Sequence, residues 1–284
     1  MTPFPSPDWH AFAAPAKLNL FLHIVGRRTD GYHLLQSVFQ LIDLADTVHM
    51  RVRADGAVVH HNPLPGVAAE ADLTVRAARL LQRETGCTLG VDLALDKRVP
   101  MGGGLGGGSS DAATVLLALN RLWGLALPRG RLMKLGLALG ADVPFFIFGR
   151  NAFVEGIGER MTPVDTQSGW FAIVHPPVHV PTPAIFAAPQ LQRATPPIRP
   201  TAIDYATTRN DLEPVACALF PQVAAARDAL ARIAPARMTG SGACLFSFSA
   251  SQTEIDCVLS RLPDGMAAFK AATLDQHPLH EFAS

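Results

Sequence analysis

A run of glycines near the middle of the chain has the composition of an anion-binding loop. Residues 102–108 contain six glycines and Leu105, with Pro100 and Met101 before them and Ser109 and Ser110 after them. Without a Cβ, successive residues allow their backbone amides to converge on one anion. A helix that begins at the serines would add free amides and its dipole. The segment therefore predicts a phosphate-binding loop. Its glycines are Gly102, Gly103, Gly104, Gly106, Gly107 and Gly108.

Glycine-rich segments also have other uses. A flexible linker does not fit, because this loop joins a predicted strand to a helix with a hydrophobic face. A Walker A loop is excluded, because no lysine follows Gly108. Gly102, Gly104 and Gly107 do match the dinucleotide pattern, but residues 125–130 lack the acidic residue that this fold places about 20 residues further on. A nicotinamide-dependent oxidoreductase therefore rests on the glycine pattern alone.

Asp142 is the carboxylate best suited to acid–base chemistry. It lies between Gly140 and Pro144, where it could accept a proton from an attacking hydroxyl or cap a short helix. The residues alone leave both roles open. Lys17 and Asn19 share one face of the first predicted strand, where a solvated lysine is the ordinary interpretation.

The overall composition points to a small-molecule partner. Of 284 residues, 49% are hydrophobic and 17% charged, and 24 basic residues balance 24 acidic ones. No long-range field would attract nucleic acid or an anionic membrane. The four cysteines are far apart, which argues against a zinc knuckle or disulfide framework. Prolines between His175 and His179 exclude the helical spacing of a metal pair, and no metal held by protein ligands is predicted.

The start of the chain lacks the marks of an export signal. Pro3, Pro5, Pro7 and Asp8 form neither a basic start nor an apolar stretch, and no apolar run approaches the length of a membrane span. We expect a cytoplasmic protein, either a monomer or a weak homodimer.

The elements that must position these residues begin with antiparallel sheet. Residues 16–26 alternate, with Leu18, Leu20, Leu22 and Ile24 on one face and a more polar set on the other. The Asp30-Gly31 turn leads into further strand over 37–53. The glycine loop lies between a predicted strand over 91–95 and a predicted helix over 109–123. A further helix is predicted upstream, over 73–84, with Gly86 at its C-cap.

The second half is less regular. We expect a helix over 131–139, a strand and turn over 153–159, and a domain boundary near Thr162, which gives domains 1–161 and 162–284. The proline-rich stretch 176–200 is predicted to be a linker or a substrate-covering loop, with a short helix at Thr182-Pro183. Residues 211–233 are rich in alanine and leucine and are expected to be helical, and residues 244–249 are expected to form a strand. Strands and helices that open with antiparallel signals indicate an α+β protein.

Together the motifs resemble the GHMP kinases. Pro-x-Gly-Gly-Gly-Leu-Gly-Gly-Gly-Ser-Ser-Asp, from Pro100 to Asp111, matches the family's central motif. One branch of the family is resembled more closely. That branch phosphorylates the 2-hydroxyl of a diphosphocytidyl-linked methylerythritol for non-mevalonate isoprenoid synthesis. The segments that carry this resemblance are the triple glycines and residues 15–20, 30–33, 139–144 and 239–243. The resemblance implies an N-terminal domain of ribosomal-protein-S5 type, a C-terminal α/β sandwich and a cleft between them that binds ATP with Mg²⁺.

The resemblance also implies roles for residues. Asp142 becomes the general base and Lys17 the cation that keeps it ionised. The glycine loop, with Lys97 upstream, becomes the ATP site. Where the family commonly has asparagine in its adenine pocket, this chain has Asp72. The substrate contacts implied are Asn19, Tyr32, His33, Phe39 and Phe186. Another GHMP kinase activity, or a nucleotide sensor without catalysis, remains an alternative.

Overall fold

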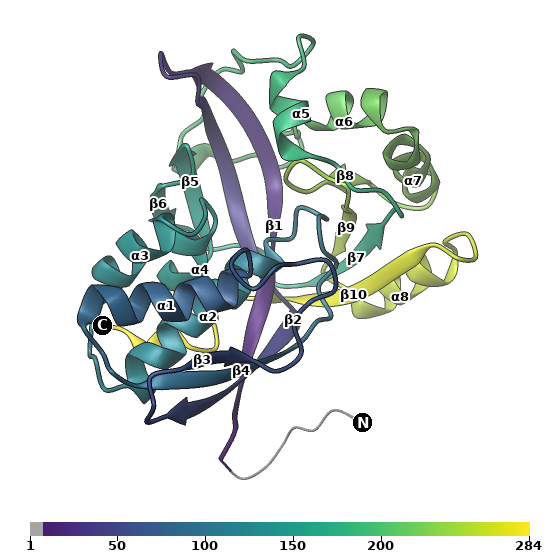
Figure 1. The fold of residues 1–284 in the computed structure, drawn as a ribbon. Helices are drawn as coiled ribbons and strands as arrows, with labels where there is room; N and C mark the ends of the chain where they lie inside the picture. The colour runs from purple at the N-terminus through teal and green to yellow at the C-terminus, as the bar shows by residue number, and fades with distance from the viewer. Residues whose placement is uncertain (1–7) are drawn as a thin grey trace.

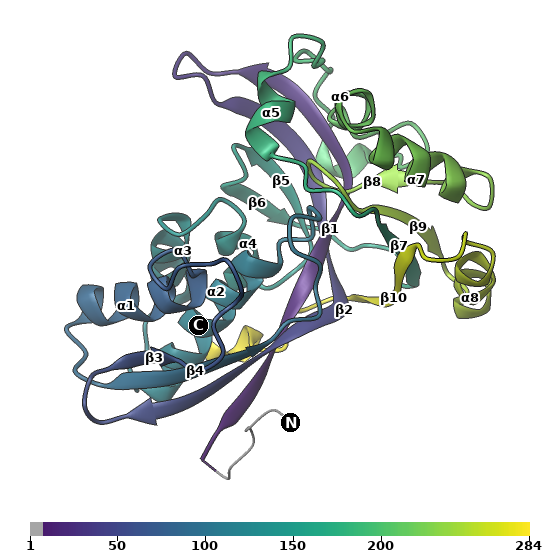
Figure 2. The ribbon, with the colours of Figure 1, turned by 45° about the vertical axis from the view of Figure 1, so that its right-hand side comes forward.

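A long hairpin forms the backbone of the computed structural model, which describes residues 8–284 (Figure 1). The proline-rich start, on which the expectation about export partly depends, lies outside the described residues. Strands β1 (His10–Arg27) and β2 (His33–Arg53) pair antiparallel through the predicted turn, where Gly31 has φ 93°. The hairpin runs through the whole molecule and is shared by its two sides (Figure 2).

All eight other named strands join this hairpin in one ten-stranded sheet. The order along the sheet is β3-β4-β2-β10-β7-β9-β8, and β1, β5 and β6 branch from it. Among the named strands, only β3 and β4 pair parallel, which excludes a doubly wound parallel sheet. The strands are β3 (Val58–His60), β4 (Gly90–Asp96), β5 (Ala152–Gly156), β6 (Arg160–Pro163), β7 (Trp170–His175), β8 (Arg237–Met238), β9 (Leu245–Ser249) and β10 (Ala267–Leu274).

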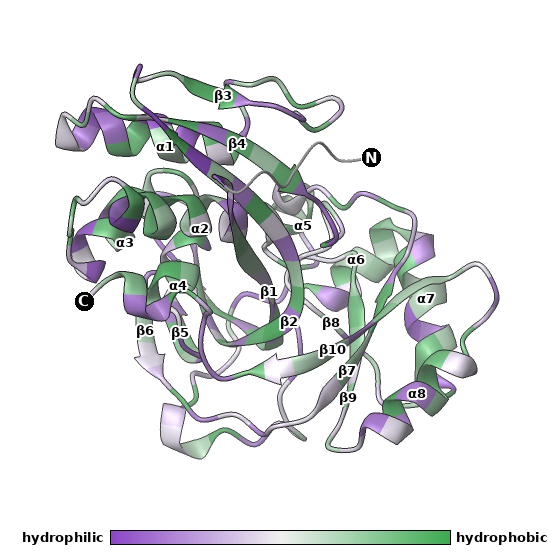
Figure 3. Ribbon diagram, turned by 90° about the horizontal axis from the view of Figure 1, so that it is seen from below, coloured by the Kyte–Doolittle hydropathy of each residue, from purple (hydrophilic) through white to green (hydrophobic). Residues whose placement is uncertain are grey.

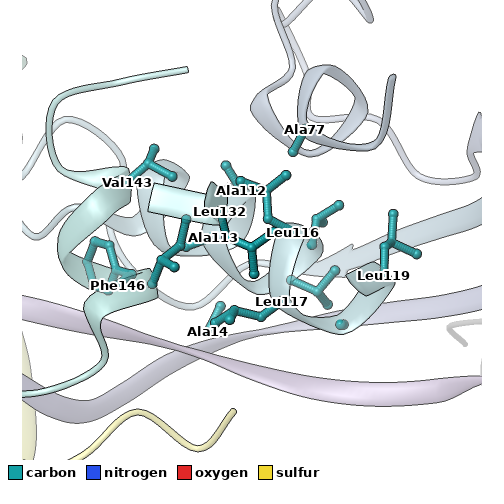
Figure 4. Close-up of a cluster of buried hydrophobic side chains, with 14 of the residues drawn as sticks. Ala14, Ala77, Ala112, Ala113, Leu116, Leu117, Leu119, Leu132, Val143 and Phe146 are labelled. Atoms are coloured by element: carbon teal, nitrogen blue, oxygen red, sulfur yellow. The ribbon is translucent and has the colours of Figure 1, made fainter. Parts of the chain in front are cut away.

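Four helices cover the sheet beside the glycine loop: α1 (Leu73–Thr85), α2 (Gly107–Leu122), α3 (Arg129–Leu137) and α4 (Val143–Phe148). The predicted end of the first helix is confirmed, because Gly86 is left-handed at its C-cap. Helix α2 is buried without interruption from Ser110 to Asn120, and it is coloured hydrophobic along most of its length in Figure 3, unlike α1 and α3. Leu116 and Leu117 pack between α1, α3 and β1 (Figure 4).

The other helices lie on the far side of the hairpin (Figure 2). They are α5 (Thr182–Ala187), α6 (Glu213–Leu219), α7 (Pro221–Ala231) and α8 (Gln252–Ser260), with 3-10 turns at Pro200–Ala202 and His280–Phe282. Most of the range 211–233 is helical as expected, but it forms two helices and not one. Phe220 is extended, with φ −129° and ψ 91°, and Pro221 starts a new helix. A proline disfavours helical geometry in the residue before it, which explains the break.

The end of the chain returns to the helices of the N-terminal half. After β10, Leu279 joins the core cluster of α1 and α2, and the C-terminus lies beside these helices in Figure 1. The Arg129 guanidinium donates to the carbonyls of His280 and Ala283. Within residues 8–284, no helix combines the length and apolar character that a membrane span needs.

Candidate active site

A cavity of about 940 Å³ lies where the two sides of the molecule meet. The N-terminal half contributes Lys17 and Asn19 from β1, the 30–33 turn and Asp142. The C-terminal half contributes residues 179–183, Phe186 and the turn 240–242. Segments far apart in the sequence therefore form one site. Seven of the predicted site residues line it from outside the glycine loop: Lys17, Asn19, Tyr32, His33, Phe39, Asp142 and Phe186.

A second cavity, of about 370 Å³, lies on the other side of the glycine loop. It is lined by Pro100, Met101 and the loop itself, by Lys97, and by Asp72 and its neighbours at the start of α1. Gly102, Gly104, Gly106 and Ser109 line both cavities. The loop is thus a shared wall, with one compartment on each side.

Close packing explains why this wall consists of glycine. Gly104 has φ 76°, and a Cβ on it would lie 2.4 Å from the Thr239 carbonyl oxygen. Gly106 has φ 72°, and its Cβ would lie 2.9 Å from the Phe146 ring. Both positions demand glycine for conformation and for space. Helix α2 begins at Gly107, so the amides of its first turn have no partner within the helix and are available to an anion.

Lys17 and Asp142 form an ion pair in the larger cavity. Lys17 Nζ lies 3.5 Å from Asp142 Oδ2, and the two side chains are 4% and 34% exposed. Lys17 also lies over the Phe39 ring, 4.8 Å from its centroid. Asp142 occupies the position before α4, yet its side chain makes no capping hydrogen bond. The simple capping role is therefore wrong, and the carboxylate remains free to act in the cavity.

The strand face that carries Lys17 is buried and not solvated. Lys17, Asn19 and His23 are 3%, 1% and 4% exposed, because the sheet has protein on both sides. Asn19 accepts a hydrogen bond from Lys17 Nζ and donates one to Ser37 Oγ, and its backbone amide donates to Thr239 Oγ1. Asn19 thus holds Lys17 in place and links the first strand to the C-terminal half. Residues 239–243 belong to the motifs of the resemblance, but nothing in their sequence indicated that the Thr239 hydroxyl accepts from the Asn19 amide.

The lysine upstream of the loop is held by two aspartates. Lys97 Nζ donates to Asp111 Oδ2 at 2.8 Å and to Asp46 Oδ2. Asp46 Oδ1 accepts from the amides of Arg98 and Val99. Burial raises the pKa of Asp111 to about 7, although Lys97 opposes that change. Lys97 borders the smaller cavity, but its ammonium group is mainly engaged in fixing the strand end to α2.

Ser109 and Ser110 differ despite being neighbours. Ser109 lines both cavities. The Ser110 hydroxyl is fully buried and donates to the Pro15 carbonyl at 2.7 Å. The expected contact between the Ser110 hydroxyl and nucleotide is therefore corrected, because that hydroxyl instead ties α2 to β1.

The expected aromatic contacts also divide into two groups. Tyr32 is 61% exposed at the cavity, and the His33 and Phe186 rings lie 5.0 Å apart at the same cavity. Phe39 is only 3% exposed and packs edge-on against Phe145 at 5.1 Å. Phe39 also lines the cavity and lies beneath Lys17, but its burial leaves little of the ring open to a ligand. Its role as a substrate contact stays a prediction.

Asp72 is bound within the protein at the edge of the smaller cavity. Its Oδ1 accepts from the Thr74 amide at 2.8 Å, and its Oδ2 lies 3.0 Å from His60 Nδ1. Burial alone would raise the pKa of Asp72, but the contacts with His60 and Thr74 outweigh burial and hold the pKa at about 2. Asp72 is therefore an ionised helix cap whose oxygens are already engaged.

Known proteins show the same organisation. Residues 72–150 match the model of the GHMP kinases N-terminal domain, and residues 201–268 that of the GHMP kinases C-terminal domain. The chain is 58% identical over 272 residues to the 4-diphosphocytidyl-2-C-methyl-D-erythritol kinase of Thiobacillus denitrificans, covering 96% of this chain and 98% of the relative. It is also 58% identical over 266 residues to the enzyme of that name from Aromatoleum aromaticum, covering 94% of each chain.

Solved structures confirm the α+β fold. A crystal structure of 4-(cytidine 5'-diphospho)-2C-methyl-D-erythritol kinase superposes with a TM-score of 0.82 at 33% identity, covering 93% of this chain and 99% of the other. Homoserine kinase from Cytophaga hutchinsonii superposes at 0.69 with 17% identity over 96% and 98% of the two chains, a likeness of fold alone. The chain belongs to the GHMP kinases, which are ATP-dependent phosphotransferases, and within them to the family of 4-diphosphocytidyl-2-C-methyl-D-erythritol kinases.

Proposed function

We propose that the protein transfers the γ-phosphoryl group of ATP to the 2-hydroxyl of 4-diphosphocytidyl-2-C-methyl-D-erythritol. The observation that carries this proposal is the Lys17–Asp142 pair, 3.5 Å apart, in a cavity that shares the glycine loop with a second compartment. Phosphoryl transfer needs an acceptor and a donor on either side of the moving group. The two compartments provide that division.

Asp142 acts as the general base in this proposal. Its carboxylate is partly exposed to the cavity and has no competing capping bond, so it can accept the proton of the attacking hydroxyl. Lys17 keeps the carboxylate ionised and orients it, because a nearby opposite charge favours the charged form. Lys17 is positioned by its hydrogen bond to Asn19 and by its contact with the Phe39 ring.

ATP occupies the smaller cavity with its phosphates at the shared wall. The free amides at the start of α2 and the Ser109 hydroxyl donate to phosphate oxygens. Pro100, Met101 and Leu73 border the space available for the adenine. Lys97 contributes positive charge behind the loop, while its two aspartates fix its position.

Mg²⁺ accompanies ATP and neutralises phosphate charge. Among the described residues, no group of three or more His, Cys, Asp and Glu side chains is arranged to hold a metal ion. In this proposal the phosphates provide most of the ligands of the ion. Ser109 is the hydroxyl that could assist in binding the ion. The Ser110 hydroxyl donates to the Pro15 carbonyl, and the Asp111 carboxylate accepts from Lys97.

The cytidine of the substrate lies at the opposite end of the larger cavity. Tyr32 and Phe186 come from different halves of the chain and offer aromatic faces for a nucleobase, and His33 offers hydrogen bonds. The proposed domains are 1–161 and 162–284, one on each side of this site, although the segment around Leu279 packs on the N-terminal side. The protein acts in the cytoplasm on a small molecule, without nucleic acid or membrane, as a monomer or weak homodimer.

The direct test measures ADP release with the diphosphocytidyl substrate, with mevalonate and with homoserine. We expect Mg²⁺-dependent turnover with the first alone. Turnover on mevalonate or homoserine instead would refute the substrate while retaining the kinase. ATP binding without turnover of any acceptor would favour a sensor, and NADH binding that ATP does not displace would favour an oxidoreductase.

A further inference from the structure

Arg193 lies outside every motif of the sequence, yet it organises the loop beside the larger cavity. Its guanidinium donates to four backbone carbonyls of the segment that contains α5, those of Phe186, Ala188, Pro189 and Leu191. Its remaining donor, Nε–H, is directed at the His33 ring, with Nε 3.1 Å from His33 Nε2. One side chain therefore connects both walls of the aromatic end of the cavity.

The contact with Arg193 determines which nitrogen of His33 carries the proton. A guanidinium has only donors and stays protonated. His33 Nε2 must therefore accept the hydrogen bond through its lone pair, so a neutral ring carries its proton on Nδ1. None of the hydrogen bonds found among residues 8–284 uses His33 Nδ1, so that N–H is available to a ligand.

The charges around His33 favour the neutral ring. Burial lowers the pKa of His33, and the positive charges of Arg193 and Arg27 lower it further. The neighbouring Phe186 ring carries no charge, and Asp30, at the same end of the cavity, is paired with Arg28 at 2.7 Å. At neutral pH the ring therefore presents one acceptor to Arg193 and one donor at Nδ1.

We propose that Arg193 is a positioning residue for base recognition: by fixing the tautomer of His33, it makes Nδ1–H a donor for the acceptor edge of the substrate's cytosine. This inference rests on the proposed function. Cytosine has acceptors at O2 and N3, whereas N3 of uracil carries a hydrogen. A fixed donor therefore favours cytosine over uracil, since a polar group left without its partner in a buried site weakens binding.

The first experiment determines the tautomer directly. Nitrogen-15 spectra of the protein labelled at histidine distinguish the protonated ring nitrogen from the unprotonated one, and His33→Gln identifies the signals of His33. We expect the proton on Nδ1 in the natural protein and a shift toward Nε2 in Arg193→Ala. A proton on Nε2 in the natural protein would overturn the proposal. This readout needs no substrate, so it stands or falls separately from the proposed function.

The second experiment measures specificity. For Arg193→Ala we expect KM for the cytidine-linked substrate to rise about tenfold, the loss of about 1.4 kcal/mol of binding, with kcat within about twofold. The ratio of kcat/KM for the cytidine-linked substrate to that for a uridine-linked analogue should decrease. Arg193→Lys keeps a donor and should restore part of that preference. Arg199→Ala is the matched control, because Arg199 is exposed in the same segment. An unchanged preference in folded Arg193→Ala would refute the proposal.

Discussion

Replacing Asp142 by asparagine separates its chemical role from any structural one. The amide has nearly the same size but cannot accept the proton of the attacking hydroxyl. A positioned general base contributes about 10²- to 10⁴-fold in rate, equivalent to about 2.7–5.4 kcal/mol of activation free energy. We therefore expect kcat to fall at least about a hundredfold by this principle.

The structure predicts a small effect of the same substitution on folding. Asp142 caps no helix and is 34% exposed, and Lys17 keeps its hydrogen bond to Asn19. Because Lys17 is only 4% exposed, the pair lies between a surface pair and a buried one, and its loss should lower the free energy of unfolding by about 1–2 kcal/mol.

Coupled ADP-release kinetics and urea unfolding measure the two effects on the same preparation. Asp256→Asn is the matched control, since it breaks a surface ion pair with Lys270 and should leave kcat unchanged. If Asp142→Asn retained more than about a tenth of the natural kcat, less than the loss expected for a general base, Asp142 would not be the base.

Three further predictions concern the loop, the core and pH. Gly104→Ala should lower the free energy of unfolding more than Gly124→Ala. An added Cβ at Gly124 would have nothing within 4 Å, so that substitution bears only the left-handed backbone cost of about 1–2 kcal/mol. Equal losses of unfolding free energy in urea would contradict the close approach of Gly104 to Thr239. Leu117→Ala, at a fully buried position, should cost about 2–5 kcal/mol of unfolding free energy, and a loss below about 1 kcal/mol would contradict the packing of α2. Burial lowers the pKa of His277 to about 3 from 6.5. Between these two pH values the folded protein binds fewer protons than the unfolded chain. The free energy of unfolding therefore falls as the pH drops from 6.5 toward 3, by up to about 1.4 kcal/mol per pH unit. His277→Asn keeps an acceptor for the Leu279 amide but does not titrate, so its unfolding free energy should fall less steeply than that of the natural protein from pH 7.5 to 5.5; parallel curves would contradict the neutral buried ring.

Elements with local signals could be predicted from the sequence. Helix α1 has regular apolar spacing and ends at Gly86, and both ends agree with the structure to within one residue. The strand, glycine loop and α2 were predictable in the same way. For these segments the pattern and the packing agree, because a single helix face or turn requires those residue types.

Contacts between distant segments had no such signal. The alternation of β1 suggested a solvated lysine, yet the C-terminal half buries Asn19 through Thr239. Arg193 and His33 meet across the cavity with nothing in either local sequence to indicate it. Such pairs depend on tertiary packing, which outweighs the preference of one strand face for solvent.

The place of β10 in the sheet has a consequence for how the chain folds during synthesis. This strand follows all the other named strands in the sequence, yet it lies between β2 and β7, and Thr273 pairs with Ile42. Until residues 267–274 emerge, β2 lacks one of its neighbours, and pairing of such distant segments is slow because a long loop must first close.

The segment after β10 also delays completion of the fold during synthesis. Leu279 follows β10 and completes the core of α1 and α2, so this core cannot close until translation has passed β10. Nascent intermediates therefore carry an incomplete sheet and an open core, the features that make partly folded proteins depend on chaperones. The N-terminal side of the cavity therefore cannot complete its packing before the C-terminal half has been synthesised.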